Sequence, residues 1–346
     1  MLSAREDVLN LLAGRPINRL PVFGGLPSLT AAGLNSAGLR LGDTHTDAAL
    51  MARAAATTFE VFGYESAVAP FDLCVEAEAL GAGVDFQSGG DGFLAPVVSQ
   101  PLLIGQLRPD APAIAALATL GRVPLVAEAV RRLRAGAGRH VAIGAWIPGP
   151  FTLSWQLFGA EAWLAATVEN EGLGEWLEAL AAALAGVGRS YREAGADFLT
   201  IHEMGGSPQV VGPRSFRRWV KPALAQLCAA LPGPVVLSVC GDTNAVVEEL
   251  VACGAAGINV DQRNQLARTR EIIGRRALLF GNLDPVGVLS QGTPEEVSAE
   301  VARIALAGAD AVWPGCDLWP EIPDANFRAL MDSARRTTGI RRRSPR

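Results

Sequence analysis

The sequence has no excess of positive charge and no long apolar run, and both absences exclude classes of protein. Its 346 residues carry 30 Lys and Arg against 35 Asp and Glu, a formal net charge of −5. A nucleic-acid surface needs clustered cations, so no nucleic-acid partner is expected. No apolar stretch reaches the ~18 residues that span a bilayer, and the charged opening segment does not resemble a signal peptide. We therefore expect no membrane partner and a cytoplasmic location.

Cysteine is scarce, and the common nucleotide-binding motifs are missing. The five cysteines form an odd, widely spaced set, namely Cys74, Cys228, Cys240, Cys253 and Cys316. Such a set does not describe a disulfide framework, so the cysteines are free thiols, metal ligands or both. No G-x-G-x-x-G motif follows the first predicted strand and no Walker lysine motif occurs, which disfavours a nucleotide-binding sheet.

The main positive feature of the sequence is a repeated βα unit. Short runs rich in Val, Ile and Leu alternate with longer stretches of helical period. Strands are predicted over Ala67–Pro70, His140–Trp146, Asp197–Ile201, Pro234–Val239, Gly257–Val260, Leu278–Gly281 and Asp310–Trp313, with weaker candidates near Leu20 and Leu102. Helices are predicted over Asp47–Phe62, Leu173–Ala194, Pro213–Leu231, Asn244–Cys253 and Pro294–Ala307, the last capped by Thr293.

This alternation predicts a parallel sheet whose two faces are both covered by helices. A count of about eight strands favours closure into a distorted (β/α)₈ TIM barrel, and an open doubly wound sheet is the alternative. Because no low-complexity linker divides the chain, we expect a single domain over residues 1–340. The basic residues 341–346 are expected to form a disordered tail.

Reactive side chains follow almost every predicted strand. In a barrel, the residues just after each strand form the active face. The residues at these positions are Asp72, His202, Glu203, Ser238, Cys240, Asp242, Asp261, Asn282, Asp284, Cys316 and Asp317. We assign catalytic roles to Asp72 and Asp242, and substrate binding to Ser238, Asn282 and Asp284.

Two of the cysteines are candidate metal ligands. Cys240 and Cys316 are separated by 316 − 240 = 76 residues and follow two different strands, so they can converge across the barrel mouth as thiolate ligands of zinc. The alternative is that both are small buried hydrophobes. Glycine and aspartate beside each favour the ligand interpretation, whereas Cys74, Cys228 and Cys253 lie in apolar or helical context and are assigned to the core.

His202 and Asp72 each allow a functional and a structural interpretation. His202 at a strand end beside Glu203 is either a metal ligand or a hydrogen-bonded structural histidine. Asp72 lies within an apolar run, where it either caps the following helix or directs a carboxylate into the pocket.

Five stretches in order resemble the uroporphyrinogen decarboxylase superfamily, and within it the methylcobamide:coenzyme M methyltransferase branch. They cover most of the chain and are Leu11–Val22 (LLAGRPINRLPV), Pro70–Phe86 (PFDLCVEAEALGAGVDF), Val235–Thr243 (VVLSVCGDT), Gly281–Leu289 (GNLDPVGVL) and Pro314–Asn326 (PGCDLWPEIPDAN). Both branches have a distorted (β/α)₈ barrel, in agreement with the strand count. The segment Phe23–Ser28 lacks the basic residues with which the decarboxylases grip their polyanionic substrate, so that reaction is disfavoured.

The resemblance implies a zinc site built from a His-x-Cys pair and a second, later Cys. Cys240 and Cys316 match the two cysteines, but Ser238 stands where the histidine is expected. Three outcomes follow: His202 or Glu203 supplies the missing ligand from a neighbouring strand end, the site binds metal weakly, or the metal has been lost.

If the resemblance holds, the chain moves a methyl group from a methylated corrinoid to a small-molecule thiol acceptor such as coenzyme M, with zinc as cofactor. The methylcorrinoid is a co-substrate carried by a separate corrinoid-binding protein, because the chain lacks the Asp-x-His-x-x-Gly signature of a cobalamin-binding domain. A folate acceptor would keep this reaction class. A cofactor-free decarboxylase or lyase that acts through Asp72 is a second candidate function, and a corrinoid- or tetrapyrrole-binding protein without turnover is a third.

Overall fold

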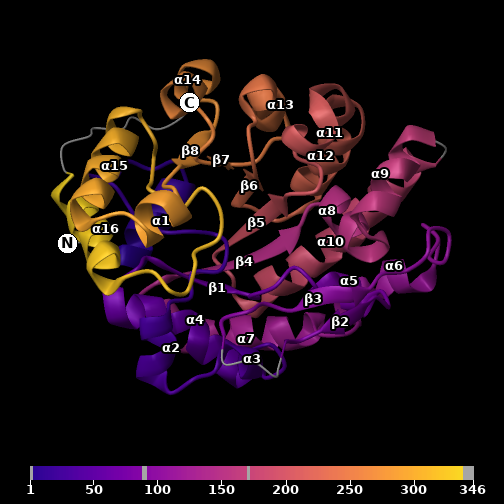
Figure 1. The fold of residues 1–346 in the computed structure, drawn as a ribbon, viewed down its shortest axis with the longest axis horizontal. Coiled ribbons are helices and arrows are strands. Elements are labelled where there is room, and N and C mark those ends of the chain that lie inside the picture. The colour runs from indigo at the N-terminus through magenta and orange to yellow at the C-terminus, as the bar shows by residue number, and fades with distance from the viewer. Residues whose placement is uncertain (1–2, 88–91, 170–171, 338–346) are drawn as a thin grey trace.

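Parallel strands surrounded by helices form the centre of the molecule (Figure 1). The computed structural model describes residues 3–87, 92–169 and 172–337. Six strands form one sheet in the order β1-β4-β5-β6-β7-β8, and two form a separate hairpin. The strands are β1 (Ser66–Ala69), β2 (Gly83–Asp85), β3 (Val97–Gln100), β4 (Ala142–Pro148), β5 (Phe198–Glu203), β6 (Val235–Val239), β7 (Gly257–Val260) and β8 (Leu278–Gly281).

Two further segments close this sheet into a barrel. Parallel bridges join Phe280 of β8 to Ala311, and Val312 to Val22. On its other side the Val22 segment meets the start of β1, because the Glu65 amide donates to the Val22 carbonyl at 3.1 Å. Six strands and these two segments make eight, so the predicted (β/α)₈ TIM barrel is confirmed and the open sheet is excluded.

The strand expected near Leu102 is not part of the barrel. The nearest strand, β3, pairs antiparallel with β2 in the separate hairpin. Its residues are largely exposed, whereas those of the barrel strands are buried. The candidate near Leu20 does join the barrel through the Val22 bridge, and the predicted Asp310–Trp313 strand appears only as isolated bridges.

The helices cover the outside of the barrel. The α-helices are α1 (Ala4–Leu12), α2 (Ala31–Ala37), α3 (Leu41–Thr44), α4 (Ala48–Phe62), α5 (Val75–Ala79), α6 (Pro112–Ala116), α7 (Val123–Ala135), α8 (Pro150–Phe158), α9 (Ala160–Glu169), α10 (Leu173–Ala194), α11 (Pro208–Ser215), α12 (Lys221–Ala230), α13 (Val247–Ala252), α14 (Leu266–Ile273), α15 (Pro294–Leu306) and α16 (Asp324–Arg336). The shorter helical turns are η1 (Leu117–Thr119), η2 (Ala137–Arg139), η3 (Phe216–Val220), η4 (Asn244–Val246) and η5 (Pro285–Ser290).

Two long predicted helices are present, but only one of them is a regular α-helix throughout. The predicted helix Leu173–Ala194 coincides with α10, whose exposed and buried residues alternate with helical period. The predicted Pro213–Leu231 helix is present as one continuous helical run, which comprises the end of α11, the wider π-helical turn η3 and α12. Gly212, at φ +79°, kinks the chain just before Pro213, where the predicted helix begins, and hydrophobic period alone does not reveal the wider turn η3 inside it.

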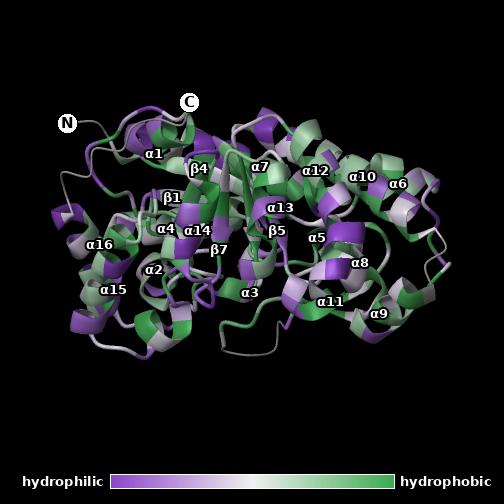
Figure 2. Ribbon diagram, turned by 90° about the horizontal axis from the view of Figure 1, so that it is seen from above, coloured by the Kyte–Doolittle hydropathy of each residue, from purple (hydrophilic) through white to green (hydrophobic). Residues whose placement is uncertain are grey.

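Successive residues of each strand point alternately into the barrel and toward the helices. Along β5, Phe198 packs with the inward residues Phe23, Phe280 and Trp313, whereas Leu199 belongs to the outer core beneath the helices. The inward aromatic rings fill the barrel interior, since Phe280 stacks on Trp313 with 4.8 Å between ring centroids. Apolar colouring follows the central strands in Figure 2. The barrel is therefore solid below the ends of its strands.

One helical run, Pro112–Ala135, is long and apolar enough to cross a membrane by length and composition alone. The expectation that no stretch would reach that length is corrected to this extent. The run is divided into α6, η1 and α7, and Arg122 near its middle pairs with the buried Asp72. A core helix passes the same test, so the run is weak evidence for a membrane span. The predicted tail and the domain end at residue 340 lie outside the described residues.

Candidate active site

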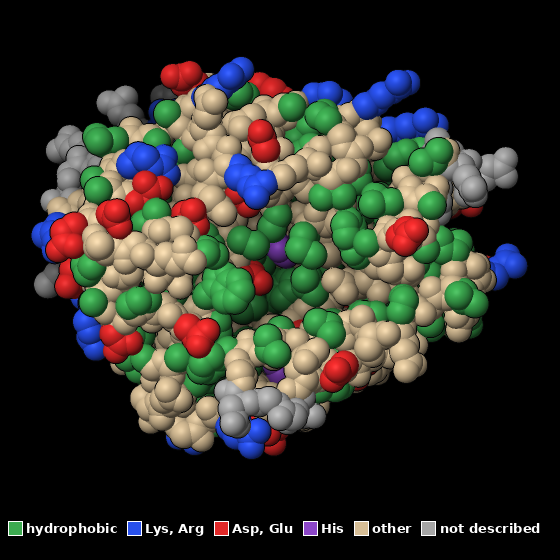
Figure 3. All heavy atoms as spheres, viewed as in Figure 1, with side chains coloured by type: hydrophobic (Ala, Val, Ile, Leu, Met, Phe, Trp, Pro, Cys, Tyr) green, Lys and Arg blue, Asp and Glu red, His purple; other side chains and the backbone are tan. Residues whose placement is uncertain are grey.

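The barrel opens on a pocket of about 640 Å³ at the C-terminal ends of its strands. Figure 3 shows a hollow in the middle of this face, bordered by apolar side chains, with a histidine side chain visible inside it. The pocket is lined by residues that follow five barrel segments, and they include Met204, Gln209, Cys240, Asp261, Arg263, Val286, Cys316, Asp317, Leu318 and Trp319. This is the position at which barrel enzymes place their reactive groups.

Three potential metal ligands meet at the pocket. The Cys240 and Cys316 sulfurs lie 3.4 Å apart, and the Cys240 sulfur lies 3.6 Å from Nε2 of His202. One ligand atom from each of the three residues lies within 4.8 Å of the other two. His202 is buried, while the two cysteines are partly exposed to the pocket. The structure thus brings together residues from three different parts of the chain.

Strand geometry explains this convergence. His202 lies near the end of β5 and pairs in register with Ser238 of β6, two residues before Cys240. Side chains at paired positions of neighbouring strands share a face, so the imidazole occupies the level of the expected His-x-Cys histidine, one strand to the side. Cys240 is fixed through its backbone, because its amide donates to the Glu203 carbonyl and its carbonyl accepts from the Ser207 hydroxyl at 2.6 Å.

The two thiols share their protons unequally. Hydrogen bonding from Cys240, assisted by His202, lowers the pKa of Cys316 well below the usual value for a thiol, even though burial opposes ionisation. The same contact with Cys316, together with burial, raises the pKa of Cys240. For His202, burial disfavours the charged imidazole, but the hydrogen bond and charge of Cys316 outweigh it and raise its pKa. The two sulfurs and the imidazole therefore form a single hydrogen-bonded unit in which negative charge is favoured on Cys316.

Asp317 borders the same unit. It lines the pocket and is exposed there. The protein atoms packed around its carboxylate and the neighbouring Cys316 raise the pKa of Asp317 to about 7.

Two of the separations between the ligand atoms can be compared with those around a tetrahedral zinc ion. Zinc–sulfur bonds of about 2.3 Å and zinc–nitrogen bonds of about 2.0 Å at tetrahedral angles place ligand atoms about 3.5–3.8 Å apart. The observed separations of 3.4 and 3.6 Å are close to these values. Two thiolates and one imidazole are also a donor set that suits zinc, and three protein ligands leave the fourth position for a substrate.

Glu203, the second candidate for the missing ligand, faces away from the thiols. Its carboxylate accepts hydrogen bonds from the Thr152 hydroxyl, the Gly206 amide at 2.8 Å and the Phe151 amide at 3.2 Å. It is buried, and it lies on the helix side of β5 because it follows the inward-facing His202. Of these two residues, only His202 is brought to the cysteines.

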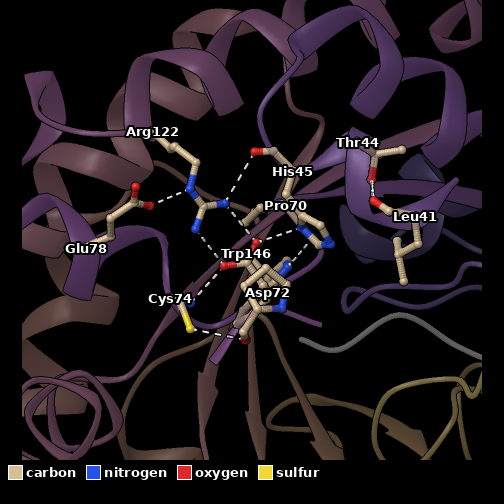
Figure 4. Close-up of polar contacts among 10 residues, drawn as sticks. Leu41, Thr44, His45, Pro70, Asp72, Cys74, Glu78, Arg122 and Trp146 are labelled. Atoms are coloured by element: carbon tan, nitrogen blue, oxygen red, sulfur yellow. Dashed lines mark hydrogen bonds and ion pairs between the residues drawn. The ribbon is translucent and has the colours of Figure 1, made fainter. Parts of the chain in front are cut away.

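Asp72 lies in a second polar cluster, which we call the Asp72 cluster and define as Asp72, His45, Arg122 and Glu78 (Figure 4). Arg122 holds both Asp72 oxygens, at 2.9 and 3.0 Å, and Nδ1 of His45 lies 3.0 Å from one of them. Arg122 also pairs with Glu78. Burial alone would raise the pKa of Asp72, but hydrogen bonds from His45 and Arg122 lower it to about 2. Its side chain is fully buried in this cluster, and both of its carboxylate oxygens are engaged.

Three further predicted residues form hydrogen bonds with the backbone of the loops that follow the strands, namely Asp242, Asn282 and Asp284. Asp242 is exposed, and its carboxylate accepts a hydrogen bond from the backbone amide of Asn244 at 2.9 Å. Asp284 caps η5 through the amides of Val286 and Gly287. The Asn282 amide group donates to two carbonyls, those of Asp261 and Asn264, and its oxygen accepts from Arg303. None of these three residues is among the described residues that line the pocket.

Sequence reasoning missed two residues of the site. Asn259 of β7 is buried beside Ser238 and donates to its hydroxyl at 3.1 Å. Arg263 lines the pocket and is the one cation among its described lining residues. The signal for Asn259 was available, because a polar residue two positions before Asp261 shares its strand face. No pattern distinguished Arg263 from the arginines elsewhere on the surface.

Comparison with known proteins gives matches over nearly the whole chain. Residues 3–337 match the family described as uroporphyrinogen decarboxylase (URO-D). The methylcobamide:CoM methyltransferase MtaA of Methanosarcina barkeri is 30% identical over 337 residues, which cover 94% of this chain and 96% of that protein. A uroporphyrinogen decarboxylase of Syntrophotalea carbinolica is 26% identical, with 98% of this chain and 99% of the relative covered.

The fold is shared with a solved structure described as a methyltransferase from Methanosarcina mazei. The TM-score is 0.89 at 26% sequence identity, and the match covers 97% of this chain and 99% of that chain. With a family match over nearly its whole length and relatives of similar size, the chain belongs to the uroporphyrinogen decarboxylase family of enzymes.

Proposed function

We propose that this enzyme transfers a methyl group from a methylated corrinoid, carried by a partner protein, to a thiol acceptor such as coenzyme M. The observation that carries the proposal is the convergence of His202, Cys240 and Cys316 at an open pocket. Relatives named as methylcobamide:CoM methyltransferases support it. The reaction has no use for a nucleic acid or a membrane, and we place it in the cytoplasm.

In this proposal, His202, Cys240 and Cys316 hold zinc. When bound there, zinc would lower the pKa of a coordinated acceptor thiol while leaving its sulfur nucleophilic. The acceptor sulfur then attacks the methyl carbon and a sulfur–carbon bond forms. The cobalt–carbon bond breaks, its electron pair stays on cobalt, and the demethylated, two-electron-reduced corrinoid is the leaving group. The thiol proton leaves to solvent through the open pocket.

The pocket residues suit both reactants. Leu318, Trp319 and Val286 line an apolar wall, which limits access of water to the reacting sulfur. Arg263 is exposed at the pocket, where it can attract an acceptor that carries one negative group. A substrate with many carboxylates would find no cluster of cations there, because Arg263 is the one cation among the described lining residues.

Metal analysis and a spectral assay test the proposal together. Purified enzyme should hold about one zinc per chain and should consume the methylcobalt absorbance of methylcobalamin when coenzyme M is added. Cys240→Ala and Cys316→Ala should lose both properties. Cys228→Ala is the matched control, since this cysteine is buried on α12 and should keep both.

Three further outcomes distinguish the candidate functions. Turnover with tetrahydrofolate and not coenzyme M would keep methyl transfer and change the acceptor. Binding of methylcobalamin without zinc and without turnover would replace the proposal with a corrinoid-binding role. Release of carbon dioxide from a porphyrinogen, abolished by Asp72→Asn, would replace it with a decarboxylase.

A further inference from the structure

His202, Ser238 and Asn259 form one row across three neighbouring strands. His202 of β5 pairs in register with Ser238 of β6, and Ser238 pairs with Asn259 of β7. All three side chains are buried, with 2%, 1% and 1% exposure. Paired positions share a face, so the row forms one polar layer inside the barrel, above the aromatic residues that fill it.

Hydrogen bonds connect the row from end to end. The Asn259 Nδ2 atom donates to the Ser238 hydroxyl oxygen at 3.1 Å and to the Pro314 carbonyl at 3.4 Å. The Ser238 oxygen in turn lies 3.4 Å from Nδ1 of His202. Pro314 stands two residues before Cys316, so the row also reaches the segment that carries one of the thiols.

The row contacts the imidazole nitrogen that faces away from Cys240. Nε2 of His202 points to Cys240, and this nitrogen can bind a metal only if the ring proton is on Nδ1. A protonated Nδ1 needs an acceptor, and the serine oxygen has two lone pairs. One of them accepts from Asn259, and the second is free to accept from Nδ1.

We propose that Ser238 and Asn259 are positioning residues that hold His202 in the metal-binding tautomer and orientation. The inference rests on the proposed function, because it concerns the same metal site. The serine hydroxyl accepts the Nδ1 proton, Asn259 fixes that hydroxyl, and the Pro314 carbonyl anchors Asn259. Outer partners of this kind raise the affinity of a site without touching the metal.

The test measures metal affinity rather than turnover. Zinc affinity is determined by competition with a chromophoric chelator, and site geometry by the visible spectrum of the cobalt(II)-substituted protein. Ser238→Ala should weaken zinc binding by about 10-fold to 100-fold and alter the cobalt spectrum. Ser238→Thr, which keeps the hydroxyl, should stay close to the original enzyme, and Asn259→Ala should lose about 10-fold.

A matched control and a second variant keep the test decisive. Ser154 is also buried and hydrogen-bonded, to the Pro150 carbonyl and the Trp176 indole, so Ser154→Ala should leave zinc affinity and the cobalt spectrum unchanged. If Ser238→Ala does not fold, Asn259→Ala carries the test. Unchanged affinity and spectrum in the folded variants overturn the inference, while zinc loss in Cys240→Ala still supports the proposed function. An original enzyme that binds no zinc overturns both.

Discussion

Two polar clusters lie at the same end of the barrel, and they differ in whether their polar atoms remain accessible to a ligand. In the Asp72 cluster, both carboxylate oxygens are held by Arg122 and His45, and Asp72 is fully buried. In the thiol site, Cys240 and Cys316 bond mainly to each other and to His202, and both are partly exposed to an open pocket. A position after a barrel strand is therefore not sufficient to make a residue reactive. Its side chain must also have an accessible atom that other protein groups do not already hold by hydrogen bonds.

Breaking the ion pair of the Asp72 cluster should have the largest effect, and the effect should be on stability. Arg122→Met leaves the buried Asp72 charge without its main partner, which should cost about 3–5 kcal/mol of unfolding free energy. Urea unfolding of the zinc-free protein measures it. Arg131→Met, at an exposed pair with Glu128, should cost less than about 1 kcal/mol. Loss of zinc binding without loss of stability would show that the two clusters are not separate.

Exchange of the paired residues tests the thiol site. His202→Ser removes one of three ligands and should weaken zinc binding by about 100-fold, with little change in stability of the zinc-free protein. Adding Ser238→His should restore part of this affinity, because positions 202 and 238 are paired on neighbouring strands. Chelator competition measures both variants. A double variant no better than His202→Ser would mean that the two positions do not present an imidazole equivalently.

The pH dependence of stability sharpens the comparison. The folded-state pKa of Asp72 is lowered from 3.8 to about 2, so its ionisation contributes stability that is complete above pH 4 and is lost as the pH falls toward 2. The contribution is about 2 kcal/mol. Asp72→Asn should therefore be less stable by about this amount at pH 6, and the difference should shrink between pH 4 and pH 2. Urea midpoints of the original enzyme and of Asp72→Asn are measured across this pH range. A constant difference between the two midpoints would contradict the assignment.

The smallest expected effect concerns the pocket rim. Arg263→Ala should raise the KM for coenzyme M about fivefold, equivalent to the ~1 kcal/mol of one exposed charge contact. The KM for 2-mercaptoethanol, which has no negative group, should not change. Methylcobalamin assays with both thiols supply the comparison. An equal change for both acceptors would assign Arg263 to the loop structure rather than to acceptor recognition.

Much of the barrel was predictable because its strands are apolar on both faces. Gly257–Val260 and Leu278–Gly281 coincide with β7 and β8. The strand near Leu102 failed because a short apolar run in a surface hairpin looks the same as a buried strand. The Pro213–Leu231 helix is present, but hydrophobic period does not reveal the wider turn η3 within it.

The site was predictable to the extent that strand ends determine it. His202, Cys240 and Cys316 were chosen by position, and the structure brings them together. Strict alternation already separates His202 from Glu203, since neighbours in a strand face opposite sides. The ion pair of Asp72 with Arg122 joins residues 50 positions apart, and no local pattern reveals such a partner.

The barrel wall is not equally continuous around its circumference. From β1 to β8 the strands form unbroken ladders, but closure between β8 and β1 depends on isolated bridges at Ala311 and Val312. Cys316 follows the segment with these isolated bridges, whereas His202 and Cys240 lie at the ends of the continuously paired strands β5 and β6. A metal ion bound by all three residues would connect the two parts of the barrel wall. Metal binding would then make local opening of the barrel between β8 and β1 less frequent, so the metal content would affect the stability of the whole barrel.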